Sequence, residues 1–144
     1  MKDMICAGVG LAGGFVASTF GGWNTAMATL LIFMAIDYVS GLVVAGVFHA
    51  SAKSSSGMLE SRAGFKGLCR KCMAVLFVLI AHRLDMALGV SYVRDTVVIG
   101  FIANELMSIV ENAGLMGLPL PAVVTGAIDV LNRQAGEQEE TDHE

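Results

Sequence analysis

Residues 96–121 carry the side chains whose types and spacing best suit a functional surface. The stretch is apolar and long enough to cross a bilayer, yet it contains two glutamates and two asparagines. At 100° per residue on a helix, its polar side chains fall within an arc of roughly 120°. Because hydrocarbon disfavours such a stripe, we expect it to face other helices, ions or water. The candidate pore-lining stripe consists of Asn104, Glu105, Ser108, Glu111 and Asn112.

Four further charged or ionisable residues interrupt apolar stretches elsewhere. Asp37 lies in the middle of one, so we expect it to be protonated, paired with Arg83 or His82, or in contact with water. His82 and Asp85 share a helix face, whereas Arg83 points about 160° away from Asp85. Anchoring of Arg83 at the membrane interface and ion pairing with the stripe both stay open. The sequence shows no nucleophile, base and orienting group together, so it does not indicate an enzyme.

Composition points to a membrane protein. Hydrophobic residues make up 55% of the 144 residues and charged residues only 15%, against about 25% charged in an ordinary globular chain. There is no general basic face for nucleic acid. Cys69 and Cys72 form a lone C-x-x-C without a second ligand pair, and Cys6 stands alone. We expect reduced thiols, and no metal or cofactor.

The apolar stretches predict an all-α integral membrane protein. Four of them can span the roughly 30 Å of hydrocarbon as helices, arranged as two hairpins. A short amphipathic helix should follow, before an acidic tail that we expect to be disordered after Gly136. The predicted spans are 4–22, 26–49, 73–93 and 97–118, within a membrane domain of residues 1–121 and ahead of a C-terminal segment of residues 122–144.

The linker at residues 51–72 is rich in basic residues and holds one acid, Glu60. Positively charged loops stay on the cytoplasmic side of a membrane. With four spans, both termini are then cytoplasmic. The basic residues of this linker are Lys53, Arg62, Lys66, Arg70 and Lys71.

Small residues recur at every fourth position of the first predicted span. This spacing lets helix backbones approach closely in lipid. Packing within one protomer and packing between protomers are equally compatible with it. The ladder includes Gly10, Gly14, Ser18 and Gly22, and Gly41 adds a weaker small patch in the second span.

Three segments, in order, resemble the phage lysis and toxin-secretion holins, which are small four-helix membrane proteins. They read IDYVSG at residues 36–41, GFKGLCRKCMAVLFVLIAHRLD at residues 64–85 and FIANELMSIVENAGLMGLPLP at residues 101–121. The resemblance implies self-assembly into holes in the bacterial cytoplasmic membrane, which release an endolysin or a toxin and set the time of lysis. The acidic tail differs from the basic tail of many holins.

Two other functions fit the same residues. A small ion-channel or transporter subunit also carries acidic and basic residues inside its helices. A scaffold membrane protein would use them for helix packing alone. Passage of folded protein, of small ions only, or of neither separates the three. The partners expected of a holin are further copies of the chain, membrane lipids and the passing endolysin or toxin.

Overall fold

The computed structural model describes residues 1–141, and within them every regular element is an α-helix. The all-α prediction is therefore confirmed. The described residues form five helices, which are α1 (Lys2–Thr19), α2 (Thr25–Gly46), α3 (Ser61–Leu88), α4 (Val93–Leu115) and α5 (Ala122–Thr141).

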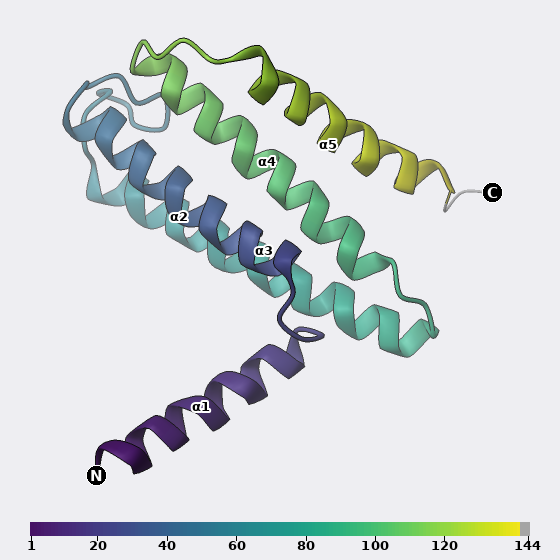
Figure 1. The fold of residues 1–144 in the computed structure, drawn as a ribbon. Coiled ribbons are helices and arrows are strands. Elements are labelled where there is room, and N and C mark those ends of the chain that lie inside the picture. Colours follow the sequence, from purple (N-terminus) through teal and green to yellow (C-terminus); the bar gives the residue numbers. More distant parts are fainter. Residues whose placement is uncertain (142–144) are drawn as a thin grey trace.

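A three-helix bundle of α2, α3 and α4 forms the centre of the molecule, and α4 packs against both other helices (Figure 1). Each helix turns an apolar face inward, as the 3.6-residue period requires. Side chains such as Leu30, Val78 and Val98, which are fully buried, form the core in the part of the bundle where α2 and α4 begin. The rest of this core consists of Met27, Met34, Ala74 and Ile102.

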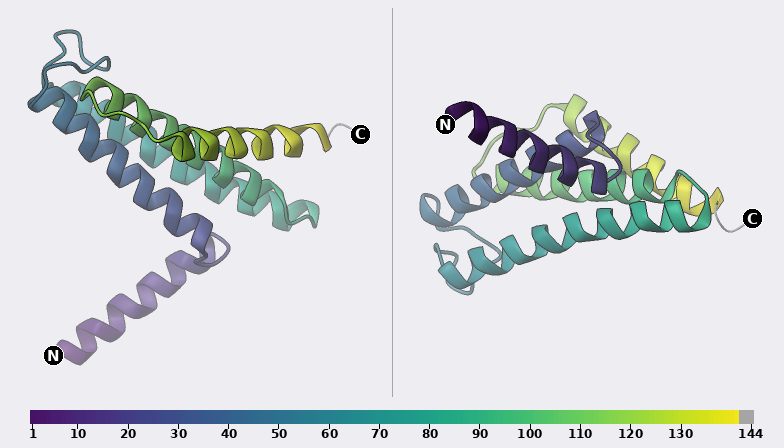
Figure 2. Two further views of the ribbon diagram at one scale, coloured as in Figure 1. Left: turned by 45° about the horizontal axis from the view of Figure 1, so that its top comes forward. Right: turned by 90° about the horizontal axis from the view of Figure 1, so that it is seen from below.

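Helix α1 leaves this bundle, so the structure does not contain the first of the two predicted hairpins. Figures 1 and 2 show α1 diverging from the bundle at the start of α2. The connecting turn uses Gly21 and Gly22 with φ of 85° and 91°, a region that favours glycine. No residue of α1 is buried. A Cβ built on Gly10 or Gly14 would meet nothing within 4 Å. The small-residue ladder is therefore not packed within the protomer.

Helix α3 starts twelve positions before the predicted third span, at Ser61 rather than at residue 73. Half of the supposed linker is therefore helix, and the loop between α2 and α3 shortens to residues 47–60. The reason is that Lys, Arg, Leu and Ala are good helix formers, and no proline interrupts residues 61–72. The polar composition of this segment predicts a linker, but the structure shows it to be the first part of a continuous helix.

Helix α5 runs back along α4 and buries Ile128 (Figure 1). It is longer than the amphipathic helix expected at residues 122–133. The prediction of disorder after Gly136 is wrong as far as Thr141, because Glu and Gln in this segment sustain a helix. The remainder of the predicted tail, residues 142–144, lies outside the described residues.

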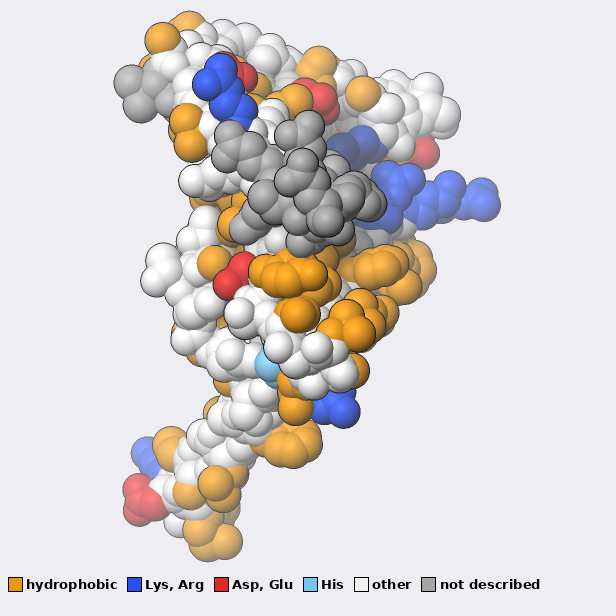
Figure 3. Space-filling model, turned by 90° about the vertical axis from the view of Figure 1, so that its right-hand side faces the viewer, with side chains coloured by type: hydrophobic (Ala, Val, Ile, Leu, Met, Phe, Trp, Pro, Cys, Tyr) orange, Lys and Arg blue, Asp and Glu red, His pale blue; other side chains and the backbone are white. Residues whose placement is uncertain are grey.

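The surface of the molecule is rich in large hydrophobic side chains (Figure 3). On α2, Ile32, Ile36 and Val39 are exposed, and α3 exposes Met73, Phe77 and others. Among the described helices, α2 alone is long and apolar enough by itself to qualify as a membrane span. The other helices combine apolar faces with charged residues.

Candidate functional site

Charged side chains from three helices meet inside the bundle. Asp37 of α2, Lys71 of α3 and Glu105 of α4 point toward one another from helices that are far apart in sequence. Each lies on the inward face of its helix, although the surrounding residues are largely apolar. Their side chains are only 6%, 12% and 7% exposed, respectively. This is a buried three-way ion pair.

Lys71 is the centre of this cluster. Its ammonium lies 2.6 Å from Asp37 Oδ2 and also donates to Glu105 Oε2. One cation is thus shared by two carboxylates, so one negative charge is not balanced by Lys71. Buried charges require partners because desolvation costs several kcal/mol per ion. Removing the lysine would leave two acids facing each other in the bundle.

Asn112, about two turns beyond Glu105 on α4, completes the polar contacts of Asp37. Its amide donates to Asp37 Oδ1 at 3.1 Å and to Ser40 Oγ at 2.9 Å. These bonds join α2 to α4 near the loop end of the bundle. A Cβ on the neighbouring Gly41 would meet the Asn112 amide at 3.8 Å, an ordinary contact distance. Space alone therefore does not require glycine at position 41.

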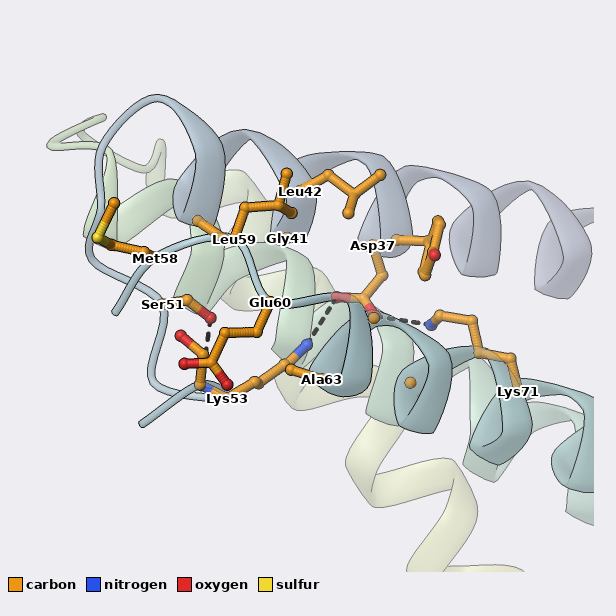
Figure 4. Close-up of a pocket in the computed structure, with 15 residues that line it drawn as sticks. Asp37, Gly41, Leu42, Ser51, Lys53, Met58, Leu59, Glu60, Ala63 and Lys71 are labelled. Atoms are coloured by element: carbon orange, nitrogen blue, oxygen red, sulfur yellow. Dashed lines mark hydrogen bonds and ion pairs between the residues drawn. The ribbon is translucent and has the colours of Figure 1, made fainter. Parts of the chain in front are cut away.

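A second cation reaches the cluster from outside the helices. The loop at residues 47–60 folds back so that Lys53 Nζ lies 3.7 Å from Asp37 Oδ1 and 3.1 Å from Ser108 Oγ. Figure 4 shows Asp37 between the ammonium groups of Lys53 and Lys71. With both lysines in place, two positive charges balance Asp37 and Glu105. We call the group Asp37, Ser40, Lys53, Lys71, Glu105, Ser108 and Asn112 the charge cluster.

The loop that carries Lys53 is itself fixed by Glu60. The Glu60 carboxylate accepts hydrogen bonds from the hydroxyls of Ser56 and Ser55, at 2.7 Å and 3.1 Å, and from the Ser56 backbone N–H. These bonds, led by that of the Ser56 hydroxyl, lower the pKa of Glu60 below its usual value. The loop therefore presents Lys53 in a defined place.

The predicted stripe on α4 is divided by the structure. Glu105 and Asn112 are buried and Ser108 is half-buried, whereas Asn104 and Glu111 are exposed. The exposed pair borders a cleft of about 370 Å³ between α3 and α4, whose walls also include Lys71 and Arg70. The stripe thus has an inner part, paired within the protomer, and an outer part.

The expected pairing of Asp37 with Arg83 or His82 is wrong. Both residues lie at the opposite end of α3, more than ten positions from Lys71. Arg83 is exposed and contacts the Met86 sulfur at 3.9 Å. His82 is half-buried against the turn at Gly21. Ion pairing of Arg83 with the stripe is not observed either, because Lys71 is the partner of Glu105.

Asp85 and Arg94 form a second polar group at this opposite end, which we call the turn cluster. Asp85 is buried and accepts hydrogen bonds from the backbone N–H groups of Val93 and Arg94, at 2.9 Å and 3.0 Å, so it caps the start of α4. The Arg94 side chain donates to the carbonyls of Phe20 and Gly22, at 2.6 Å and 3.1 Å. It ties the turn after α1 to the bundle.

Sequence reasoning missed the roles of Lys71 and Arg94. Lys71 was assigned to a cytoplasmic linker together with Arg62, Lys66 and Arg70. On a continuous helix, however, Lys71 lies about 180° from Arg62, on the opposite face. That spacing predicts that Lys71 faces a different direction from the exposed basic residues. No such spacing identifies Arg94, because its acceptors are backbone carbonyls of a distant turn.

The cysteines take no part in either cluster. Cys6, Cys69 and Cys72 are exposed and unpaired. Within residues 1–141, the structure brings together no group of three His, Cys, Asp or Glu side chains suited to a metal ion. Within the described residues, the two clusters pair buried charges with one another and with backbone groups.

Comparison with known proteins agrees with these features. A sequence model of the bacteriophage holin family matches residues 14–133. The chain is 30% identical to a probable holin of Bacillus phage phi105 over 114 residues, or 78% of each protein. It is 37% identical to an uncharacterized protein of Listeria monocytogenes over 122 residues, which cover 84% of this chain and 81% of the relative. No solved structure matches significantly. The chain belongs to the bacteriophage holin family.

Proposed function

We propose that this protein is a holin that assembles in the bacterial cytoplasmic membrane. Copies of the chain accumulate there and then form holes through which an endolysin, or a toxin, leaves the cytoplasm. The family is a non-enzymatic, pore-forming class of membrane proteins, and one relative is described as a probable holin. Self-association, the cargo and the timing of lysis are the parts of this proposal that experiment must test.

One observation carries the proposal, namely that the bundle buries charged and polar side chains beside its apolar core and exposes many large hydrophobic side chains. Its buried residues include Asp37, Arg94, Glu105 and Asn112, while many large hydrophobic side chains are exposed. A water-soluble protein places these groups the other way round, because exposed apolar patches are unfavourable in water. In a bilayer the same arrangement is favourable, since lipid covers the apolar surface and the polar groups satisfy one another.

The charges on α3 support a membrane span for this helix too. Arg70 and Arg83 are exposed and separated by thirteen residues, or about 20 Å along a helix. Exposed apolar residues such as Met73, Phe77 and Ile80 lie between them. Arginine side chains extend several ångströms toward the interface by snorkelling. Arg70 and Arg83 can thus reach opposite surfaces of a bilayer about 30 Å thick. This spacing supports α3 as a span with its basic end in the cytoplasm, and we propose α1, α2 and α4 as the other three spans.

The charge cluster suggests how a closed protomer is kept from opening. In the monomer its charges are paired internally, so little polar surface meets lipid. When several protomers associate, the same side chains can face a wet lumen, where their desolvation cost disappears. Helix α1 suits the association step, because the face that carries Gly10 and Gly14 is unoccupied in the protomer.

The test is controlled expression in bacteria that also produce a cytoplasmic muralytic enzyme. A holin releases that enzyme abruptly after a delay and collapses the membrane potential at the same moment. The variant Glu105→Gln alters the buried pair, whereas Glu111→Gln alters an exposed acid on the same helix as a control. We expect Glu105→Gln to shift the time of release and Glu111→Gln to leave it close to wild type. Loss of small ions without enzyme release would instead indicate a channel or transporter.

A further inference from the structure

The outward face of α3 changes chemistry along its length. Arg62, Lys66 and Arg70 follow one another at four-residue spacing, so their side chains fall within about 80° of arc. All three are exposed. The same face continues with Met73 and Ile80, which are exposed and apolar. A basic surface and an apolar surface are thus joined end to end on one helix.

The three basic residues take part in none of the ion pairs among the described side chains. The ion pairs among the described side chains involve Lys53, Lys71 and Arg94. Lys71, the only cation of the α3 segment that turns inward, is on the other side of the helix. Phe65 and Leu68 are exposed beside the basic residues, as expected for a helix that enters a membrane interface. Figure 3 shows Lys and Arg side chains projecting beside hydrophobic ones.

Arg70 also reaches a concave site. It lines the cleft of about 370 Å³ between α3 and α4, together with Asn104, Ser108 and Glu111. An arginine suits a phosphate group, because its planar guanidinium donates several hydrogen bonds. The neutral and acidic groups nearby suit a ligand that adds hydroxyl donors to its phosphate.

We propose that this face of α3 binds an anionic phospholipid of the cytoplasmic leaflet, with Arg62, Lys66 and Arg70 on the headgroup and the Met73–Ile80 face on the acyl chains. The inference rests on the membrane placement proposed above, because only in that placement does the apolar part of this face meet acyl chains. A phospholipid is the occupant that matches both halves of the face in this order. Anionic headgroups attract basic side chains near the surface, and the apolar half offers acyl chains a surface that a purely ionic ligand would leave unused.

The test uses the full chain in bilayer discs of phosphatidylglycerol and phosphatidylcholine in equal amounts. After gentle extraction, retained lipid is counted by native mass spectrometry. The wild type should retain phosphatidylglycerol selectively, and the variant R62Q/K66Q/R70Q should lower its affinity roughly 100-fold, at about fivefold per basic side chain. The control Arg83→Gln removes an exposed cation from the other end of α3 and should change retention little.

Salt provides a measurement that needs no variant. Because screening shortens the Debye length to about 3 Å at 1 M salt, selective retention by the wild type should fall there. Equal retention of both lipids by the wild type, or equal losses in R62Q/K66Q/R70Q and Arg83→Gln, would overturn the inference. Enzyme release from bacteria is measured separately. Selective lipid retention without release would refute the holin proposal and leave the lipid site standing, and release without selectivity would do the reverse.

Discussion

The charge cluster and the turn cluster are both buried polar groups in an apolar bundle, but they bond in different ways. In the charge cluster, side chains of α2, α3 and α4 pair with one another. In the turn cluster, Asp85 and Arg94 pair mainly with backbone groups of the start of α4 and of the turn after α1.

The two clusters therefore differ in whether their hydrogen-bonding partners can be exchanged. Backbone partners stay where the secondary structure puts them, so the turn cluster fixes how the helices connect. Side-chain partners can be exchanged for water or for another protomer when helices move. We therefore expect changes in the turn cluster to alter stability, and changes in the charge cluster to alter stability and the time of hole opening together.

The largest effect should come from Lys71→Met. Because this variant leaves Asp37 and Glu105 buried without their shared cation, we expect the free energy of unfolding to fall by about 3–5 kcal/mol. Reversible unfolding of the detergent-solubilised chain measures it. Arg70→Met is the control, since the neighbouring arginine is exposed. Adding Asp37→Asn and Glu105→Gln to Lys71→Met should restore most of the stability. No recovery in this triple variant would show that the charges are not the cause.

Arg94→Ala should cost less, about 2–3 kcal/mol, because it leaves the carbonyls of Phe20 and Gly22 without their donor. The same unfolding assay measures this, with Arg83→Ala as the exposed control. Enzyme release should keep its abrupt onset if the protein still accumulates. A shift in onset as large as that caused by Glu105→Gln would erase the distinction between the two clusters.

A smaller effect, about 1–3 kcal/mol, is expected for Gly21→Ala. Its φ is positive, and a Cβ there would lie 2.7 Å from His82 Nδ1. Gly22→Ala is a matched control, because Gly22 also has a positive φ but a Cβ there would meet nothing within 4 Å. The excess loss of stability in Gly21→Ala over Gly22→Ala measures the close contacts with His82 and with Arg94 Nε, which would lie 3.1 Å from the new Cβ. Equal losses of stability in the two variants would mean that the neighbouring side chains move aside without an energetic penalty.

The smallest effect concerns the loop that presents Lys53. Because the folded-state pKa of Glu60 is lowered, its contribution to loop stability is present above the ordinary value of 4.5 and disappears as pH falls through the lowered value. Titration of Glu60 by NMR should show that Ser56→Ala raises this pKa. Ser54→Ala is the control, since the Ser54 hydroxyl has no partner among the described residues. An unchanged pKa in Ser56→Ala would refute these hydrogen bonds.

The sequence predicts the helical class and most of α2 and α4, because long apolar stretches without proline leave few alternatives. It also identifies Asp37, Glu105 and Asn112 as residues that must avoid lipid. Their partner was assigned wrongly because composition suggested a linker where α3 continues. Treating residues 61–72 as helix places Lys71 opposite the basic face and directs it inward.

Other features depend on contacts that no local pattern encodes. Arg94 finds backbone carbonyls more than seventy residues earlier in the chain. Divergence of α1 depends on two consecutive glycines with positive φ, which a sequence reads only as a tight turn. The direction of α5 along α4 depends on burial of Ile128 and on packing of Leu131 against the core, contacts that the sequence of α5 alone does not specify.

In the proposed mechanism, the bundle interior around Lys71 and Glu105 meets water once a hole forms. Ala74 tests it directly, because it lines the same cleft and is only 8% exposed in the closed protomer. In a chain with its three native cysteines replaced, Ala74→Cys is probed with a membrane-impermeant thiol reagent before and after opening, and Ile80→Cys on the exposed apolar face is the control. We expect Ala74→Cys to become labelled only on opening, while Ile80→Cys stays unlabelled. An unreactive Ala74→Cys in cells that are releasing enzyme would contradict it.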